Sequence, residues 1–164
     1  MNDAADSQGL PTAEERAPIL AAIPHRPPFL FVDRIVQLDA KQISTEYRVR
    51  QDDLFVGGHY PGNPLMPGVL ICEAILQAGA VLMAHLDAPD AAAPGFAPGV
   101  PVLSRLSDAT FRRPVRPGEL LEIEVELVER AGPAVQLRGR ASVAGKVAVR
   151  AGFTTALVPH DRLA

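Results

Sequence analysis

The chain has 164 residues, of which 48% are hydrophobic, and its formal net charge is −3 at pH 7. A chain of this length is expected to form a single domain with one core, and its acidic balance argues against a nucleic-acid binder, which needs a basic surplus. The single cysteine, Cys72, excludes an intrachain disulfide, so we expect a reducing cytoplasmic location. The polar, acidic N-terminus lacks the apolar stretch of a secretory signal.

The first part of the chain predicts a short helix and two strands. Residues 1–13 are expected to be a disordered lead, with Thr12 placed to cap a helix over residues 14–23. Three prolines then force an extended path. The β-prone run 29–38 predicts a strand, and period-two alternation over residues 43–50 predicts its antiparallel partner.

A loop and a long helix occupy the middle of the chain. Glycines and prolines keep residues 57–68 out of regular structure. The apolar run 69–85 then predicts a buried helix about 25 Å long, which approaches the length of a membrane span. Glu73 and Gln77 interrupt the run and share one helical face. Because a carboxylate there must be paired, neutralised or functional, we predict a core helix and no membrane span.

The last part of the chain predicts strands. A connection rich in Pro, Ala and Gly covers residues 87–101, long enough for a lid, an interface segment or disorder. Turn signals then separate four expected strands, over residues 102–111, 120–129, 134–143 and 146–158. In the second of these, glutamates alternate with apolar residues, which predicts one face in water and one face in the core.

The order of these elements predicts the fold class. Helical and strand segments are segregated, which indicates an α+β fold, and short turns between the last strands favour an antiparallel sheet. A helix that is apolar on every side must be covered by that sheet. A chain this short can cover it only if the sheet curls around it. We predict one such domain over residues 14–164.

Three stretches carry recognisable motifs. Residues 23–34 read Ile-Pro-His-Arg-Pro-Pro-Phe-Leu-Phe-Val-Asp-Arg. Residues 58–77 read Gly-His-Tyr-Pro-Gly-Asn-Pro-Leu-Met-Pro-Gly-Val-Leu-Ile-Cys-Glu-Ala-Ile-Leu-Gln, and residues 111–119 read Phe-Arg-Arg-Pro-Val-Arg-Pro-Gly-Glu. Together they resemble the FabZ-type (3R)-hydroxyacyl-acyl-carrier-protein dehydratases from about residue 19 to residue 158. The resemblance implies the hotdog fold, a curled antiparallel sheet around one long helix.

The residue types of the middle motif suit the removal of water from a 3-hydroxyacyl thioester. This reaction needs a base for the C2 proton, and a neutral imidazole at His59 suits that role. It also needs an acid for the leaving hydroxyl, and burial favours a protonated carboxyl at Glu73, which would donate the proton or orient the hydroxyl. By resemblance, the backbone at Gly68 contacts the developing oxyanion, with Val69 beside it in the substrate site. Gln77 is placed to hold the carboxylate of Glu73.

The resemblance also implies partners. The substrate is carried on the phosphopantetheine of acyl carrier protein, with no other cofactor and no metal. Arg112, Arg113 and Arg116 form either a solvated turn or a docking site for this acidic carrier. The family pairs the histidine of one subunit with the glutamate of the other, so we expect a homodimer with shared sites, alone or as a hexamer of three dimers.

Other residues have weaker functional signals or depart from the family. His25 is expected to orient its loop, and Cys72 to pack in the core. Arg105 stands where the family often has Gly, next to the acyl tunnel, and Ile75 and Leu76 are bulkier than the family's usual residues. These departures leave the acyl chain length open.

The sequence leaves two rival functions open. One is another hotdog thioester enzyme, either a thioesterase or a dehydratase-isomerase, although the isomerase branch typically has Asp at the position of Glu73. The other is a specialised or non-catalytic paralogue within a lipid or polyketide assembly system.

Overall fold

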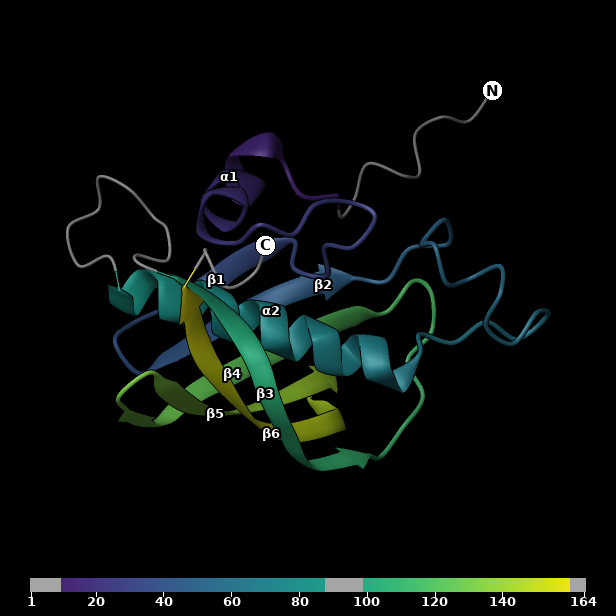
Figure 1. Cartoon of the computed structure of the whole chain (residues 1–164). Helices are drawn as coiled ribbons and strands as arrows, with labels where there is room; N and C mark the ends of the chain where they lie inside the picture. The colour runs from purple at the N-terminus through teal and green to yellow at the C-terminus, as the bar shows by residue number, and fades with distance from the viewer. Residues whose placement is uncertain (1–9, 88–98, 160–164) are drawn as a thin grey trace.

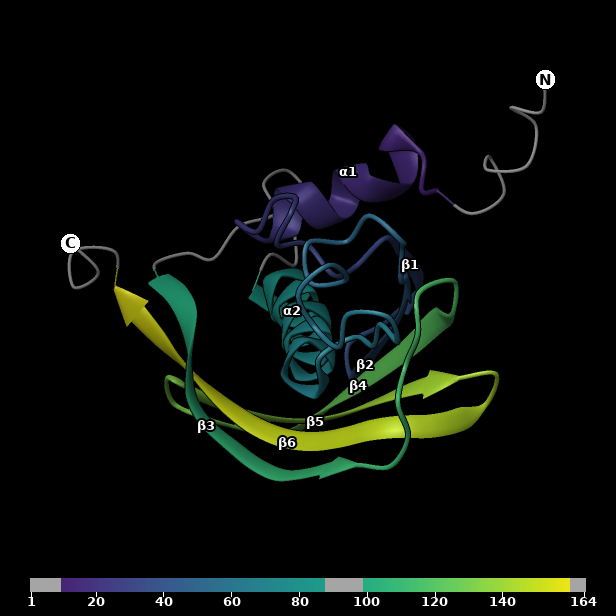
Figure 2. The ribbon, with the colours of Figure 1, turned by 90° about the vertical axis from the view of Figure 1, so that its right-hand side faces the viewer.

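The computed structural model describes residues 10–87 and 99–159. Most of the expected disordered lead (residues 1–13) and of the connection over residues 87–101 lies outside these ranges. Within them, the helix α2 (Gly68–Asp87) packs on the inner side of one curled six-stranded sheet (Figures 1 and 2). The predicted α+β fold, with an antiparallel sheet curled around one long helix, is confirmed.

The sheet runs in the order β1-β2-β4-β5-β6-β3, and every neighbouring pair is antiparallel. Exposed and buried residues alternate along the first part of the fourth strand, as its glutamates predict. The third strand pairs with the sixth and so forms one edge of the sheet. The strands are β1 (Arg34–Leu38), β2 (Gln42–Arg48), β3 (Gly99–Phe111), β4 (Leu120–Ala131), β5 (Ala134–Val143) and β6 (Lys146–Pro159).

The helix α1 (Ala13–Ala22) lies on the side of α2 away from the sheet (Figure 2). Its predicted cap is confirmed, because the Thr12 hydroxyl accepts a hydrogen bond from the Glu15 amide at 3.1 Å. The Glu15 carboxylate in turn accepts one from the Thr12 amide at 2.8 Å. This capping box satisfies two backbone donors at the start of the helix.

The buried carboxylate of Asp33 ties three segments together. It accepts hydrogen bonds from Arg16 on α1 at 2.9 Å, from Arg50 at 2.6 and 2.7 Å, and from the backbone amide of Arg48 at 2.9 Å. The backbone amide of Arg50 donates to the side chain of Asp53 at 2.8 Å and not to a neighbouring strand. β2 therefore ends at Arg48, and the prediction of a strand over residues 43–50 is too long.

The strand predicted over residues 29–38 also begins later, at Arg34. The amide of Phe31 donates to the side-chain oxygen of Gln77 at 2.8 Å, and the Gln77 amide nitrogen donates to the carbonyl of Phe29 at 3.3 Å. The central helix therefore takes the backbone groups that a strand would have used. This competition is tertiary, so local β propensity did not reveal it.

Two glycines set how closely α2 approaches the sheet. A Cβ at Gly79 would lie 2.6 Å from Cζ of Phe153, and a Cβ at Gly139 would lie 2.2 Å from Cγ2 of Ile75. The β-branched Ile75, fully buried on α2, therefore fits because β5 has no side chain opposite it.

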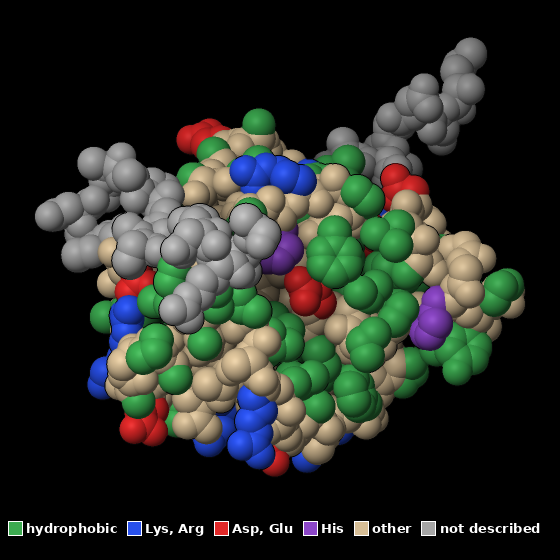
Figure 3. Space-filling view, in the orientation of Figure 1, with side chains coloured by type: hydrophobic (Ala, Val, Ile, Leu, Met, Phe, Trp, Pro, Cys, Tyr) green, Lys and Arg blue, Asp and Glu red, His purple; other side chains and the backbone are tan. Residues whose placement is uncertain are grey.

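One stripe of α2 is not covered within the chain, so the prediction of a helix buried on every side is wrong for a single copy. Val69 is 70% exposed. Glu73, Leu76 and Ala80 follow it at helical spacing and are half-buried. Hydrophobic side chains gather over this open side of the molecule (Figure 3). By length and composition α2 could span a membrane, but 61% of its most apolar window is buried inside the protein, as in a core helix.

Candidate functional site

His59 lies in the connection between β2 and α2, which projects beyond the first turn of α2 (Figure 1). Its Nδ1 is 2.9 Å from the carbonyl oxygen of Leu65. Because a carbonyl oxygen only accepts, Nδ1 carries the hydrogen in this contact. In the neutral ring, Nε2 then holds the free lone pair. The fixed tautomer suits Nε2 to act as a base.

Glu73 lies on the open stripe of α2, and its carboxylate is held by a residue one helical turn further along the helix. Its Oε1 accepts a hydrogen bond from Nε2 of Gln77 at 2.9 Å, which confirms the predicted contact between these residues. Gln77 is only 1% exposed, and its amide also bonds the backbone of Phe29 and Phe31. A fully bonded amide holds one oxygen of Glu73 in place. Within the described part of the chain, no hydrogen bond reaches Oε2 of Glu73.

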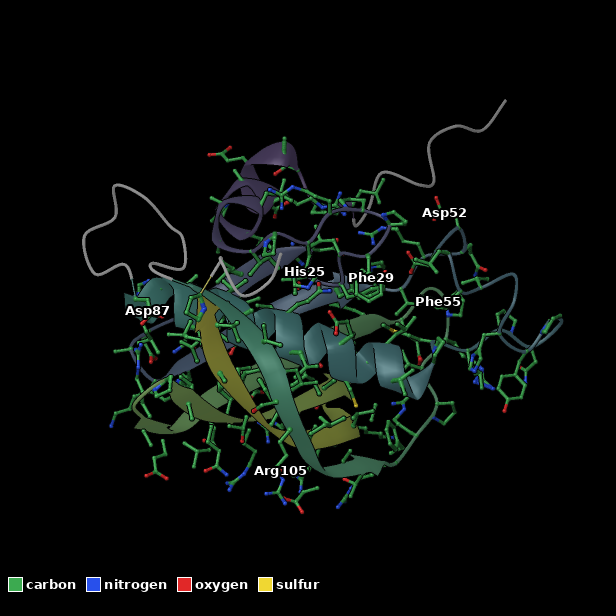
Figure 4. All side chains as sticks on the ribbon, viewed as in Figure 1. His25, Phe29, Asp52, Phe55, Asp87 and Arg105 are labelled. Carbon is green, nitrogen blue, oxygen red and sulfur yellow. The ribbon has the colours of Figure 1, made fainter. Side chains whose placement is uncertain are left out.

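The imidazole beside Glu73 belongs to His25 and not to His59. His25 Nε2 lies 3.5 Å from Glu73 Oε1, whereas no ion pair within 4.0 Å joins Glu73 to His59 in the described structure. Figure 4 shows His25 and Phe29 side by side above α2. The sequence predicted only that His25 orients its loop. No local signal places residue 25 against residue 73, since their contact depends on how the segment after α1 crosses the helix.

The start of α2 offers backbone donors. The amides of Leu70 and Ile71 bond the carbonyl of Pro67 at 2.9 and 3.1 Å. Those of Gly68 and Val69 have no backbone acceptor among the described residues. Unpaired N–H groups at a helix start favour negative charge, so this end of α2 has the donors predicted for a developing oxyanion.

The three candidate docking arginines differ in their contacts. Arg113 donates to Glu119 at 2.9 Å and to the carbonyl of Val143 at 3.2 Å, so its guanidinium is already bound. Arg112 and Arg116 are exposed and have no ion pair in the described ranges.

The interpretation of Arg105 as a residue beside an acyl tunnel is wrong for this chain. Arg105 pairs with Thr154 across β3 and β6, and the next pair is Leu106 with the buried Phe153. Successive strand residues face opposite sides, so Arg105 points to the face away from α2. Figure 4 shows it on that outer side.

The same outer face has a hollow of about 560 Å³. Arg140 and Glu124 on its rim form an ion pair at 2.7 Å, which is ordinary for exposed cross-strand neighbours. The sheet separates this hollow from Glu73, so it is not part of the candidate site.

Comparison with known proteins places the chain in a family. Residues 23–152 match the family model described as FabA-like domain. The 3-hydroxyacyl-acyl-carrier-protein dehydratase FabZ of Symbiobacterium thermophilum is 44% identical over 138 residues, covering 83% of this chain and 92% of the relative. The protein of the same name from Caulobacter vibrioides is 40% identical over 159 residues, covering 96% of each chain.

Solved structures agree on the fold. The structure titled "The Dehydratase Heterocomplex ApeI:P from Xenorhabdus doucetiae" aligns with a TM-score of 0.75 at 18% identity, covering 89% of this chain and 94% of that chain. A hypothetical thioesterase with coenzyme A from Streptococcus pneumoniae aligns with a TM-score of 0.59 at 15% identity. Both have the curled sheet and helix of the hotdog fold. With the family model and the two relatives, it follows that this chain belongs to the FabA-like family and, within it, to the FabZ-type 3-hydroxyacyl-acyl-carrier-protein dehydratases.

Proposed function

We propose that this protein removes water from (3R)-3-hydroxyacyl thioesters on acyl carrier protein and gives trans-2-enoyl thioesters in fatty-acid biosynthesis. The observation that carries this proposal is the carboxylate of Glu73 on an apolar helix, with Oε1 held by the buried amide of Gln77 at 2.9 Å. One oxygen is fixed, and the other is left for a substrate hydroxyl. The names of the relatives support the same reaction.

The proposed step assigns one task to each group. Nε2 of His59 takes the C2 proton, and the electrons of that C–H bond form the C2–C3 double bond as the C3–O bond breaks. The hydroxyl takes a proton from the carboxyl of Glu73 and leaves as water. The amides of Gly68 and Val69 stabilise the negative charge that develops on the thioester oxygen. The imidazolium then returns its proton to Glu73 before the next turnover.

The separation of these groups within one copy supports a site shared between two copies. In the described part of one copy, no hydrogen bond or ion pair joins His59 to Glu73, and the stripe of α2 that contains Glu73 is open. Next to it, the edge strand β3 exposes Leu103, Leu106 and Phe111 at 44%, 44% and 56%. An apolar edge of this kind pairs readily with another chain. We therefore place His59 of one copy against Glu73 of another in a two-fold dimer, alone or within a hexamer.

Carrier docking and location are further parts of the proposal. Arg112 and Arg116 are exposed cations near the end of β3, where an acidic carrier would be attracted. The carrier's phosphopantetheine would present the acyl chain, with no other cofactor. A cytoplasmic location fits the single cysteine, which is buried and free.

A turnover assay tests this function. Purified protein would be incubated with (3R)-3-hydroxyacyl thioesters of several chain lengths, and both enoyl product and free thiol would be measured. We expect the enoyl thioester to form and no thiol to be released. Thiol release without enoyl product at any length would overturn the proposal in favour of a thioesterase.

A further inference from the structure

We infer that His25 is a positioning residue for the reaction: it donates to the same carboxylate oxygen of Glu73 as Gln77 does, and so keeps the other oxygen turned toward the substrate. This deepens the proposed function and rests on the proposed role of Glu73.

The geometry around Glu73 supports two donors on one oxygen. Nε2 of Gln77 is 2.9 Å from Oε1, and Nε2 of His25 is 3.5 Å from the same atom. The second distance exceeds that of an ordinary hydrogen bond. Contacts of catalytic groups are often long in the free enzyme and shorten when substrate binds. Both nitrogens approach Oε1, so Oε2 remains for a hydroxyl.

The backbone around His25 is held rigidly enough for this task. The guanidinium of Arg26 donates to the carbonyls of Leu20, Ile23 and His25 at 2.9, 2.8 and 2.7 Å. The ring of Phe29 stacks with the imidazole at a ring-centre distance of 6.5 Å. The backbone carbonyl of Phe29 accepts a hydrogen bond from Gln77. The segment that contains His25 is thus fixed at one end to α1 and at the other to α2.

The surroundings of the imidazole of His25 indicate which of its two nitrogens carries the hydrogen. Nδ1 of His25 is buried and has no hydrogen-bond partner in the described structure. If Nε2 carried a lone pair, it would face the lone pairs of the Glu73 carboxylate at 3.5 Å. A hydrogen on Nε2 removes this repulsion and lets the ring donate to Oε1, which is not the oxygen that carries the acid proton in the proposed step. Nε2 is therefore the donating atom, and the position of that atom is what a substitution must preserve.

Two amide substitutions separate this role from simple packing. The amide nitrogen in His25→Gln is as many bonds from Cβ as Nε2 of the imidazole, whereas in His25→Asn it matches Nδ1. We expect His25→Asn to lose about 10-fold in kcat at an almost unchanged KM, because a misplaced catalytic group slows the chemical step. His25→Gln should stay within about 3-fold of wild type.

The outcomes are decisive when Glu73→Gln is included as a reference and thermal unfolding is measured for each variant. If His25→Asn keeps wild-type kcat, or if both variants lose kcat equally, the positioning role is wrong. Wild-type turnover together with an inactive Glu73→Gln would show that the proposed function still holds in that case. An inactive wild type would instead overturn the proposed function itself.

Subunit mixing adds an independent readout. His25 and Glu73 come from the same chain, so in a shared-site dimer His25→Asn should be rescued by His59→Ala and not by Glu73→Gln. Random pairing gives about a quarter of wild-type activity in the first mixture and about a twentieth in the second. Rescue by Glu73→Gln, or no rescue by His59→Ala when His59→Ala and Glu73→Gln do rescue each other, would contradict the inference.

Discussion

The ring of Phe111 lies directly over Gly68, at the point where α2 begins. A Cβ on this glycine would come within 2.7 Å of Cδ1 of Phe111, closer than real Cβ atoms approach other atoms. The end of β3 thus fixes the first turn of the helix whose free amides we assign to the oxyanion. Any side chain at residue 68 must move either the ring or the helix start.

Gly68→Ala should therefore lower kcat/KM by on the order of 10²-fold, because a small shift of oxyanion donors is costly. The clash is local to the first turn of α2, so thermal stability should change little. Gly57→Ala is the matched control, since a Cβ there meets nothing within 4 Å. Adding Phe111→Ala should restore part of the activity. Equal activity in Gly68→Ala and Gly57→Ala would contradict this role of the helix start.

The contact of Ile75 with Gly139 makes a prediction about stability. Gly139→Ala should destabilise the protein by about 1–3 kcal/mol in urea unfolding, because the new methyl group overpacks the core. Ile75→Leu removes the γ2 methyl group that a Cβ at residue 139 would meet. In a double-mutant cycle, the variant with both Gly139→Ala and Ile75→Leu should then be more stable than the sum of the two single effects predicts. Additive effects would mean that the helix and β5 adjust independently.

Cys72 should respond to pH in a defined direction. Burial raises the pKa of its thiol, so the folded protein keeps the proton at a pH where the unfolded thiol, with a pKa of about 8.5, ionises. The stability from this group is complete below pH ~8.5 and is lost as pH rises from there toward the folded-state pKa.

Two measurements check this pH dependence. The native thiol should react slowly with an aromatic disulfide reagent and rapidly in denaturant. The free energy of unfolding should fall less steeply above pH ~8.5 in Cys72→Ala than in wild type. Rapid labelling of the native protein would show that the thiol is not protected.

The arginines near the end of β3 should differ in their effects. Arg112→Glu and Arg116→Glu should raise KM for a carrier-linked substrate and leave a small thioester mimic unaffected, since only the carrier is strongly acidic. Salt should weaken the wild type in the same selective way, because exposed charges are screened beyond about 10 Å at 0.1 M.

Arg113→Glu is the contrasting variant. It breaks the bond to Glu119 at 2.9 Å and places two carboxylates together. It should therefore lower stability and affect both substrates equally. If Arg112→Glu and Arg116→Glu also affect both substrates equally, the carrier does not dock there.

Local chemistry explains which features the sequence predicted well. The cap at Thr12 depends on residues within one turn, and the alternating glutamates of β4 reflect only the two faces of a strand. The link from Gln77 to Glu73 spans one helical turn, so spacing alone predicted it. Each of these features requires no knowledge of distant segments.

The features that the sequence did not predict involve distant segments. The late start of β1 arises because Gln77 captures the backbone of Phe31, far away in the chain. The approach of His25 to Glu73 and the pairing of Arg113 with the carbonyl of Val143 have the same origin. The open stripe on α2 could not be predicted from a run of apolar residues, because such a run looks the same whether or not the rest of the chain covers all of its faces.

The central claim is that each site combines His59 of one copy with Glu73 of another. His59→Ala and Glu73→Gln should each be inactive, because loss of a general base or acid costs about 10²–10⁴-fold. When the two variants are mixed and exchange subunits, about half of the dimers become hybrids, and each hybrid has one doubly damaged site and one intact site. We predict recovery of about a quarter of wild-type activity, with exchange verified by mass spectrometry. Confirmed exchange without recovered activity would contradict the shared site and would place both groups within one chain.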